Sequence, residues 1–278
     1  MKKKLALLMA VIMVCSLAFT ACGNSASSAP AASAPAAGTT TQDLAVQIGP
    51  DPETIDPALN SAIDGANMII HAFETLLIID KDNKVVPGQA ESWDVSEDGM
   101  EYTFHLRKDL KWSDGSPLTA ADFEYSWKRV VDPATAAPYA DLFNVIKGFD
   151  KASAGDIDAL AVEAVDDTTL KVTLGVPCAY FDQLAAFTTY SPVQKATVEA
   201  NGDAWATSPA TYVSNGSFTV TDWVPGEYIL MSKNENYWNA DAIKLNTIKF
   251  VLMEDANASL SAYENGEILM VKDIPGAE

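Results

Sequence analysis

Cysteine is scarce in this chain, which has three among 278 residues. Cys15 and Cys22 fall near the N-terminus and Cys178 stands alone, so the sequence offers no framework of intramolecular disulfides. Histidine is scarcer still, with only His71 and His105. Because no pattern that would activate a thiol accompanies Cys178, we interpret it as a small packing residue and not as a nucleophile.

Basic residues are also few, with 18 lysines and arginines against 38 aspartates and glutamates and a net charge of −20. No basic stripe with interleaved aromatic side chains occurs. Because neutralisation of phosphates supplies most of the affinity for nucleic acid, we expect no nucleic-acid partner. We interpret the acidity as a solubility feature, and the alternative is that it steers cationic peptides toward the protein.

The motifs of common catalytic and metal sites are missing. No phosphate-cradling glycine loop, HExxH helix or GxSxG turn occurs. A segment that begins at Asp80 resembles a calcium loop, but its fifth position is Lys84 and Val85 replaces the required glycine, so a turn leading from residues 76–79 into Val85 and Val86 is the better interpretation. His71 and Glu74 lie one helical turn apart, which is weak evidence for a metal. The sequence predicts no catalytic residue, no metal and no cofactor.

The N-terminal segment has the features of an export signal. Three lysines (residues 2–4) precede an apolar run over residues 5–19, which is shorter than the roughly 20 residues that a membrane-spanning helix needs. A Phe-Thr-Ala-Cys sequence resembling a lipobox ends at Cys22, so we predict a lipoprotein signal peptide over 1–21 and lipidation of Cys22. The alternative is ordinary signal-peptide cleavage.

The segment over residues 22–41 consists largely of Gly, Ser, Ala, Pro, Asn and Thr. This composition cannot build a hydrophobic core and predicts a flexible tether. Two acyl chains on Cys22 would anchor such a tether stably, whereas one chain binds a membrane only marginally. We therefore expect an extracytoplasmic protein held at the cell membrane by its N-terminal lipid.

The remaining sequence predicts a mixed fold of helices and strands. Alternating apolar and polar residues predict strands over 44–48, 101–107, 169–174, 217–223 and 247–252. Helical spacing of apolar residues predicts helices over 66–77, 120–131 and 256–263. Thr119 and Asp122 form a capping-box pattern at the start of the second helix.

One long segment is distinctive. Residues 90–115 read AESWDVSEDGMEYTFHLRKDLKWSDG and are followed by SPLTAADFEYSWKRVVDP. Taken alone, this segment predicts a strand, a turn and a helix of the core. It resembles the signature of the extracellular solute-binding proteins of family 5, which capture oligopeptides, dipeptides and, in some branches, nickel complexes for bacterial ABC importers. Shorter matching segments lie at 53–58, 71–76, 86–90, 214–218, 236–238 and 266–268.

The resemblance implies an α/β, mixed α+β fold like that of the periplasmic binding proteins, with two lobes of type II. We expect residues 42–75 and 195–278 to form a first, sheet-bearing domain and residues 76–194 to form an inserted second domain. Family members are much longer than this chain. The chain is therefore expected to be an N-terminal portion without the C-terminal lobe.

The resemblance also implies where a ligand binds. The segment that contacts the peptide backbone in the family falls on Ser61, Ala62 and Ile63. Tyr139 matches a tyrosine that faces the cleft, and the alternative is a core aromatic. Asn215 is a further ligand-binding candidate, although Asn-Gly is also simply a turn.

The function implied by the resemblance is that of the substrate-binding component of a peptide ABC importer. Such a protein is not an enzyme, and we expect a monomer that captures oligopeptides or dipeptides and delivers them to permease subunits. Two alternatives remain open: a nickel or other small-solute binder of the same family, and a surface lipoprotein with a signalling or adhesion role.

Overall fold

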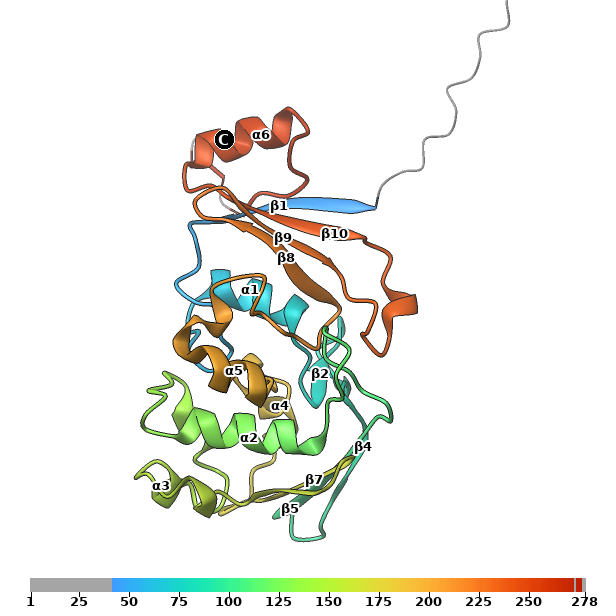
Figure 1. The fold of residues 1–278 in the computed structure, drawn as a ribbon, viewed down its shortest axis with the longest axis vertical. Helices are drawn as coiled ribbons and strands as arrows, with labels where there is room; N and C mark the ends of the chain where they lie inside the picture. Colours follow the sequence, from blue (N-terminus) through green and yellow to red (C-terminus); the bar gives the residue numbers. More distant parts are fainter. Residues whose placement is uncertain (1–41, 273, 277–278) are drawn as a thin grey trace, which may run out of the picture. The chain divides into compact units, whose positions relative to one another are not determined.

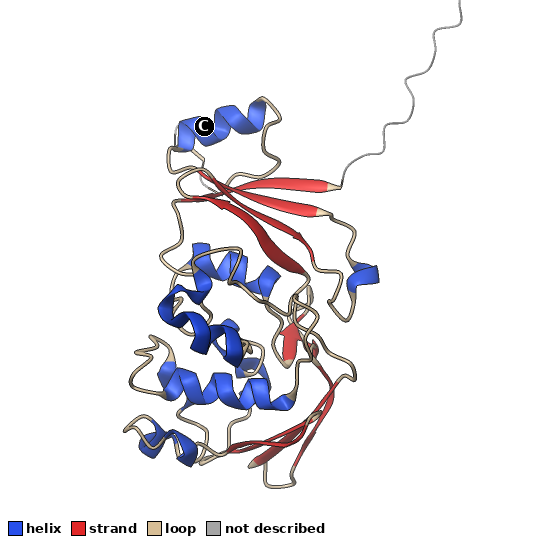
Figure 2. Cartoon of the chain, viewed as in Figure 1, coloured by secondary structure: helices blue, strands red, loops and turns tan. Residues whose placement is uncertain are grey.

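Residues 42–272 and 274–276 are described in the computed structural model of the protein (Figures 1 and 2). The predicted signal peptide (1–21), the predicted tether (22–41) and Cys22 lie outside these residues. No helix within the described part of the chain has the length and apolar character needed to cross a bilayer.

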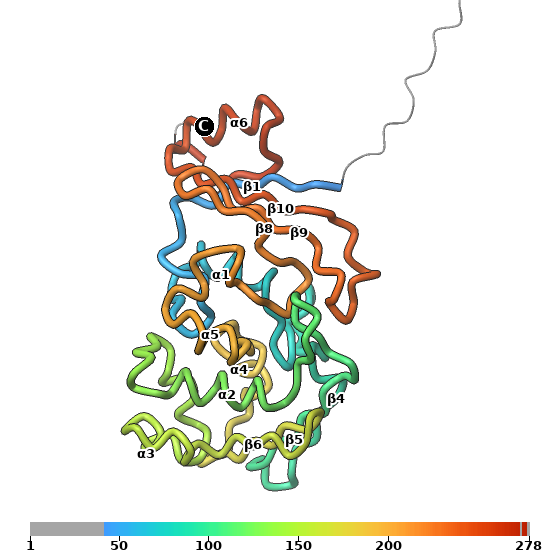
Figure 3. The backbone as a smooth tube through the Cα atoms, viewed as in Figure 1, coloured from blue at the N-terminus to red at the C-terminus, as the bar shows by residue number. Residues whose placement is uncertain are grey.

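A mixed four-stranded sheet in the order β1-β10-β9-β8 brings together segments from the two ends of the described chain. Its strands are β1 (Asp43–Gly49), β8 (Phe218–Val224), β9 (Tyr228–Lys233) and β10 (Thr247–Leu252). β1 runs parallel to β10, whereas the other two pairs are antiparallel (Figure 3). Helix α1 (Ile63–Ala72) packs against β8, and its Met68, Ile69 and Ala72 are buried.

The chain after this sheet returns to the free edge of β1. Helix α6 (Ala256–Glu264) is capped by the Asp255 side chain and stops before Gly266, whose φ of +75° suits glycine. The backbone N–H of Leu269 then donates to the carbonyl of Ala45 at 2.8 Å, and that of Gln47 donates to the carbonyl of Met270 at 3.0 Å.

A second sheet is antiparallel, in the order β4-β5-β7-β6. Its strands are β4 (Ala90–Val95), β5 (Glu101–Leu106), β6 (Val162–Asp166) and β7 (Thr169–Thr173). Tyr102, Phe104 and Leu106 are buried on one face of β5, as the alternation predicts. Helix α2 (Ala120–Val131) packs against β6 and β7, and Thr119 and Asp122 form the predicted capping box.

A hairpin of β2 (Leu77–Ile79) and β3 (Val85–Pro87) connects α1 to the second sheet. The Asp80 carboxylate accepts the backbone N–H groups of Asp82 and Lys84, so it closes a turn as predicted. The shorter helices are η1 (Ala140–Phe143), α3 (Phe149–Ala152), η2 (Ile157–Ala159), α4 (Phe181–Leu184), η3 (Thr188–Tyr190), α5 (Lys195–Asn201), η4 (Gly202–Ala206) and η5 (Ala240–Ala242).

Most predicted elements are confirmed to within a residue at either end, but the helix predicted over 66–77 is wrong in its limits. Helix α1 begins earlier, at Ile63, and ends at Ala72, after which Phe73 is extended. The reason is tertiary. The Asn215 side chain forms hydrogen bonds with both backbone groups of Glu74, and the backbone N–H of Gly216 donates a hydrogen bond to the carbonyl of Ala72 at 2.7 Å.

The two sheets are built from residues of the two predicted domains, yet the described residues from 42 onward belong to one compact unit. The division into a first domain (42–75 and 195–278) and an inserted second domain (76–194) therefore stays a prediction.

Candidate ligand-binding face

The backbone just before α1 is exposed and partly unbonded. Ser61, Ala62 and Ile63 are all exposed, and 68% of Ile63 is accessible to solvent. Ala62 is the N-cap, and its carbonyl accepts bonds from the N–H of Ala66 and the amide of Asn60. Within the described residues, both backbone groups of Ser61 and the N–H of Ile63 make no hydrogen bond. These groups are free to bond an extended ligand backbone.

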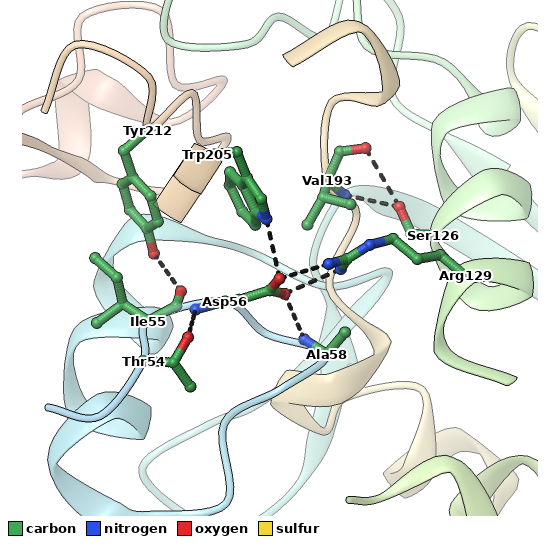
Figure 4. Close-up of polar contacts among 9 residues, drawn as sticks. All are labelled: Thr54, Ile55, Asp56, Ala58, Ser126, Arg129, Val193, Trp205 and Tyr212. Carbon is green, nitrogen blue, oxygen red and sulfur yellow. Dashed lines mark hydrogen bonds and ion pairs between the residues drawn. The ribbon is translucent and has the colours of Figure 1, made fainter. Parts of the chain in front are cut away.

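A buried ion pair anchors the segment that leads to this backbone (Figure 4). The Asp56 side chain accepts two bonds from the Arg129 guanidinium of α2, Nη1 to Oδ1 at 3.0 Å and Nη2 to Oδ2 at 2.6 Å. Trp205 Nε1 donates to Oδ2 at 2.9 Å, and the N–H of Ala58 donates to Oδ1 at 2.9 Å. Burial acts to lower the pKa of Arg129, but the bonds and charge of Asp56 raise it above its usual value.

Further contacts hold the residues on either side of Asp56. The hydroxyl of Tyr212 donates to the carbonyl of Ile55 at 2.8 Å, and the N–H of Asp56 donates to the hydroxyl of Thr54 at 3.0 Å (Figure 4). The Tyr212 ring stacks on Trp205 at 5.5 Å, and burial raises its pKa well above 10. The segment before Ser61 is therefore fixed from several elements at once.

A groove with a volume of about 400 Å³ lies beside the C-terminal half of α1. Ile70 is on its wall, seven residues after Ile63, so both side chains lie on one helix face. Phe73, Ile79 and Thr188 also line the groove. Because 55% of Ile70 and 52% of Ile79 are exposed, the wall is an accessible apolar surface.

Glu74 lies at this groove and is almost fully buried. Its Oε1 accepts bonds from Trp238 Nε1 at 2.7 Å and Gln89 Nε2 at 3.2 Å, and its Oε2 accepts the hydroxyl of Tyr237. The Arg107 guanidinium lies 3.5 Å from the centre of the Trp238 ring. Burial raises the pKa of Glu74, against the opposing effects of the Tyr237 and Trp238 bonds and of the Arg107 charge.

Asn215 is buried behind this carboxylate. Its Oδ1 accepts the backbone N–H of Glu74 at 3.1 Å, and its Nδ2 donates to the Glu74 carbonyl at 2.9 Å. Both polar ends of the side chain are thus engaged within the protein, where they bond the two backbone groups of Glu74. Its predicted contact with a ligand stays a prediction.

Tyr139 is partly exposed, at 37%. Its ring meets Phe187 edge to face at 5.7 Å, and Phe187 is itself 40% exposed. The next residue, Thr188, lines the groove beside α1. Tyr139 therefore packs against a residue whose two neighbours in the chain, Ala186 and Thr188, line the groove.

Sequence reasoning missed Ile70 and Phe187. A signal for Ile70 was present, because Ile69 and Ile70 are adjacent on a helix and only one of them can face the core. Ile69 is the buried one. Phe187 lies in an irregular segment, where apolar periodicity carries no information.

Solved structures of bacterial binding proteins are similar to this chain. OppA of Burkholderia pseudomallei is 37% identical with a TM-score of 0.80, over 85% of this chain and 47% of that one. The murein tripeptide binding protein MppA of Escherichia coli is 33% identical with a TM-score of 0.82, over 86% of this chain and 47% of that one. The fold is therefore that of the periplasmic solute-binding proteins of the OppA type, with mixed helices and sheets.

Residues 84–278 match the family described as "Bacterial extracellular solute-binding proteins, family 5 Middle". The chain belongs to this family. The periplasmic oligopeptide-binding protein OppA of Escherichia coli is 41% identical over 236 residues, which are 84% of this chain and 43% of that protein. OppA of Bacillus subtilis is 39% identical over 229 residues, or 81% and 42% of the two chains. The chain thus spans less than half the length of these relatives.

Proposed function

We propose that the protein is the substrate-binding component of a peptide ABC importer, which captures oligopeptides or dipeptides outside the cytoplasm and delivers them to permease subunits. The observation that carries the proposal is the unbonded, exposed backbone at Ser61 and Ile63, held in place by the Asp56 network. Such a backbone can bind an extended peptide through main-chain hydrogen bonds, which give affinity without selecting the peptide's sequence.

The relatives support a peptide ligand. They include oligopeptide-binding proteins and the dipeptide-binding protein DppE of Bacillus subtilis, which is 35% identical over 220 residues. OppA of Haemophilus influenzae has been solved in complex with the peptide RPPGFSPFR. In this proposal Tyr139 and Phe187 provide aromatic cover for the ligand, and the protein acts by binding, without catalysis.

A second candidate is a small amphipathic solute. One relative, 36% identical over 223 residues, is described as a probable deoxycholate-binding periplasmic protein of Escherichia coli. The exposed apolar wall at Ile70 and Ile79 suits such a ligand. Titration with deoxycholate beside a peptide mixture would distinguish the two candidates.

We also propose that the protein is a monomer held at the membrane through a lipid on Cys22. A Cys22→Ala variant is expected to move from the membrane to the soluble fraction, because two acyl chains provide the stable anchor. An unmodified N-terminus beyond residue 22, found by mass spectrometry of the native protein, would refute the lipid anchor.

The backbone site is tested by replacing Ile63 with proline in the full-length gene product. Ile63 is the first residue of α1, where proline is tolerated, and Ala62 is extended (φ −114°, ψ 153°), as a residue before proline must be. Ile63→Pro therefore removes the free N–H and keeps the helix. Loss of one such bond is expected to weaken peptide binding about threefold to tenfold in calorimetry.

The matched control is Ile63→Ala, which removes the same side chain and keeps the N–H. Ser61→Ala, which leaves the backbone intact, should change little. Equal peptide affinities for Ile63→Pro and Ile63→Ala would show that this backbone does not bind the ligand.

A further inference from the structure

We propose that the groove beside α1 receives one uncharged, apolar side chain of the bound peptide and makes the protein selective for peptides with a leucine-like or aromatic residue at one position. This inference rests on the proposed function. It adds a preference for peptides with one apolar side chain, which bonds to the peptide main chain cannot provide.

The size and walls of the groove suit a single apolar side chain. Its volume of about 400 Å³ is near the lower end of the ~300–1,000 Å³ typical of pockets for whole drug-sized ligands. Ile70, Phe73, Ile78, Ile79 and Ala186 supply apolar surface on several sides. Ile70 and Ile79 are more than half exposed without a ligand, so an apolar side chain placed against them removes surface from water on both partners.

The charges at the groove disfavour ionised side chains of either sign. Glu74 is the only acidic or basic residue among those that line it. Its two carboxylate oxygens already accept three hydrogen bonds, from Trp238, Gln89 and Tyr237, and it is 8% exposed. An entering lysine would lose its hydration and find no free carboxylate, and an entering aspartate would meet a like charge.

In this proposal the residues of the groove, and not the protein's net charge of −20, decide which side chain is preferred there. The overall charge acts over long distances and affects the encounter rate of cationic peptides. Selection at a given position depends on what the side chain touches once it is bound, and the lining of the groove includes three isoleucines, Ile70, Ile78 and Ile79.

The spacing along α1 gives the expected position of the selected residue. Ile63 and Ile70 are seven residues apart, or roughly 10 Å at 1.5 Å per helical residue. An extended peptide covers roughly 3.3 Å per residue. A peptide that is bonded at Ile63 and runs along α1 would span this distance in about three residues.

The test uses the full-length gene product and alanine hexapeptides in which Leu, Phe, Gly, Lys or Glu occupies each position in turn. Calorimetry should find one position at which Leu or Phe binds at least about tenfold more tightly than Gly, with Lys and Glu no better than Gly. A parallel scan with N-methylated peptides locates the residue bonded at Ile63. The preferred position should lie about three residues from it.

An Ile70→Asp variant should lose the preference, because a carboxylate replaces part of the apolar wall of the groove. Val165, an exposed apolar residue of β6, provides the control, and Val165→Asp should keep the preference. Equal affinities for Leu and Gly at every position would overturn the inference and leave peptide binding intact. So would tightest binding of Lys, or a preference that survives in Ile70→Asp. If no hexapeptide binds, the proposed function fails, and this inference fails with it.

Discussion

Two buried carboxylates flank α1 and are held in different ways. Asp56, before the helix, bonds a guanidinium directly through both oxygens, whereas Glu74, after it, bonds neutral donors from Tyr237, Trp238 and Gln89. Each also accepts a tryptophan indole N–H. Their surroundings thus differ chiefly in where the positive charge lies. The Arg129 guanidinium contacts the Asp56 carboxylate directly, whereas the Arg107 guanidinium contacts the ring of Trp238, which in turn bonds Glu74.

For Glu74, hydrogen bonds from neutral donors do not offset the cost of burying the charge. Three neutral hydrogen bonds leave the pKa of Glu74 raised, because desolvation is the largest effect on it. The Asp56 pair instead ties the backbone before Ser61 to α2 and Trp205, and it raises the pKa of Arg129. The Asp56 network is therefore expected to provide rigidity, and the Glu74 network a sensitivity to pH.

Removing the charge at Asp56 should have the largest effect. Asp56→Ala leaves the buried Arg129 guanidinium without a partner, and we expect a loss of about 3–5 kcal/mol in the free energy of unfolding. Equilibrium unfolding in urea measures it. Exposed Asp241 offers a control, since Asp241→Ala should change the stability by less than about 0.5 kcal/mol.

Removing both partners should cost less than the sum of the single changes. Asp56→Ala combined with Arg129→Met leaves no unpaired charge, so a double-mutant cycle is expected to give a coupling energy of about 0.5–3 kcal/mol. Additive effects in the urea data would show that the two side chains stabilise the fold independently, and the contrast with Glu74 would lose its basis.

A Glu74→Gln variant should alter the pH dependence of stability. The pKa of Glu74 is higher in the folded state than in the unfolded state, so between the two values the folded state binds more protons and stability falls as the pH rises. The contribution is greatest below the unfolded pKa of about 4.3 and is lost as the pH rises through the folded pKa.

Glutamine does not ionise, so the variant should gain stability relative to the parent as the pH rises through that window. Unfolding midpoints in urea, measured from about pH 4 to pH 8, test this. Exposed Glu97 serves as the matched control, and Glu97→Gln should track the parent. Parallel curves for Glu74→Gln and the parent would contradict a raised pKa.

The smallest effect is expected from Tyr237→Phe. Loss of one hydrogen bond to Glu74 should cost about 0.5–1.5 kcal/mol. Because the Tyr237 bond lowers the pKa of Glu74, its removal should shift the pH dependence to still higher pH. The same urea series measures both changes, and a shift to lower pH would show that the hydroxyl does not stabilise the ionised carboxylate.

Short-range features of this fold were predictable, and long-range ones were not. The capping box at Thr119, the turn at Asp80 and the alternation in β5 depend on residues a few positions apart, and all three are present. The ion pair between Asp56 and Arg129 joins residues 73 positions apart, and no periodicity relates them. The Glu74 carboxylate likewise meets donors at Gln89, Tyr237 and Trp238, which lie 15, 163 and 164 positions away from it in the sequence.

In the candidate site, too, some residues could be predicted from the sequence and others could not. The similarity of the sequence to its family directed attention to Ser61, Ala62, Ile63 and Tyr139, and the structure leaves all four at least partly exposed. It could not reveal that both polar atoms of the Asn215 amide bond the Glu74 backbone, or that Phe187 packs against Tyr139.

By itself, the sequence determined the five predicted strands, the helices α2 and α6 and the family, because each depends on spacing or on residues close together along the chain. Only the tertiary structure decided that α1 stops at Ala72. The helical pattern continues to Leu77, but backbone bonds from Asn215 and Gly216 compete with the next helical turn and prevail. The groove has the same origin, since its walls come from segments that meet only when the chain has folded.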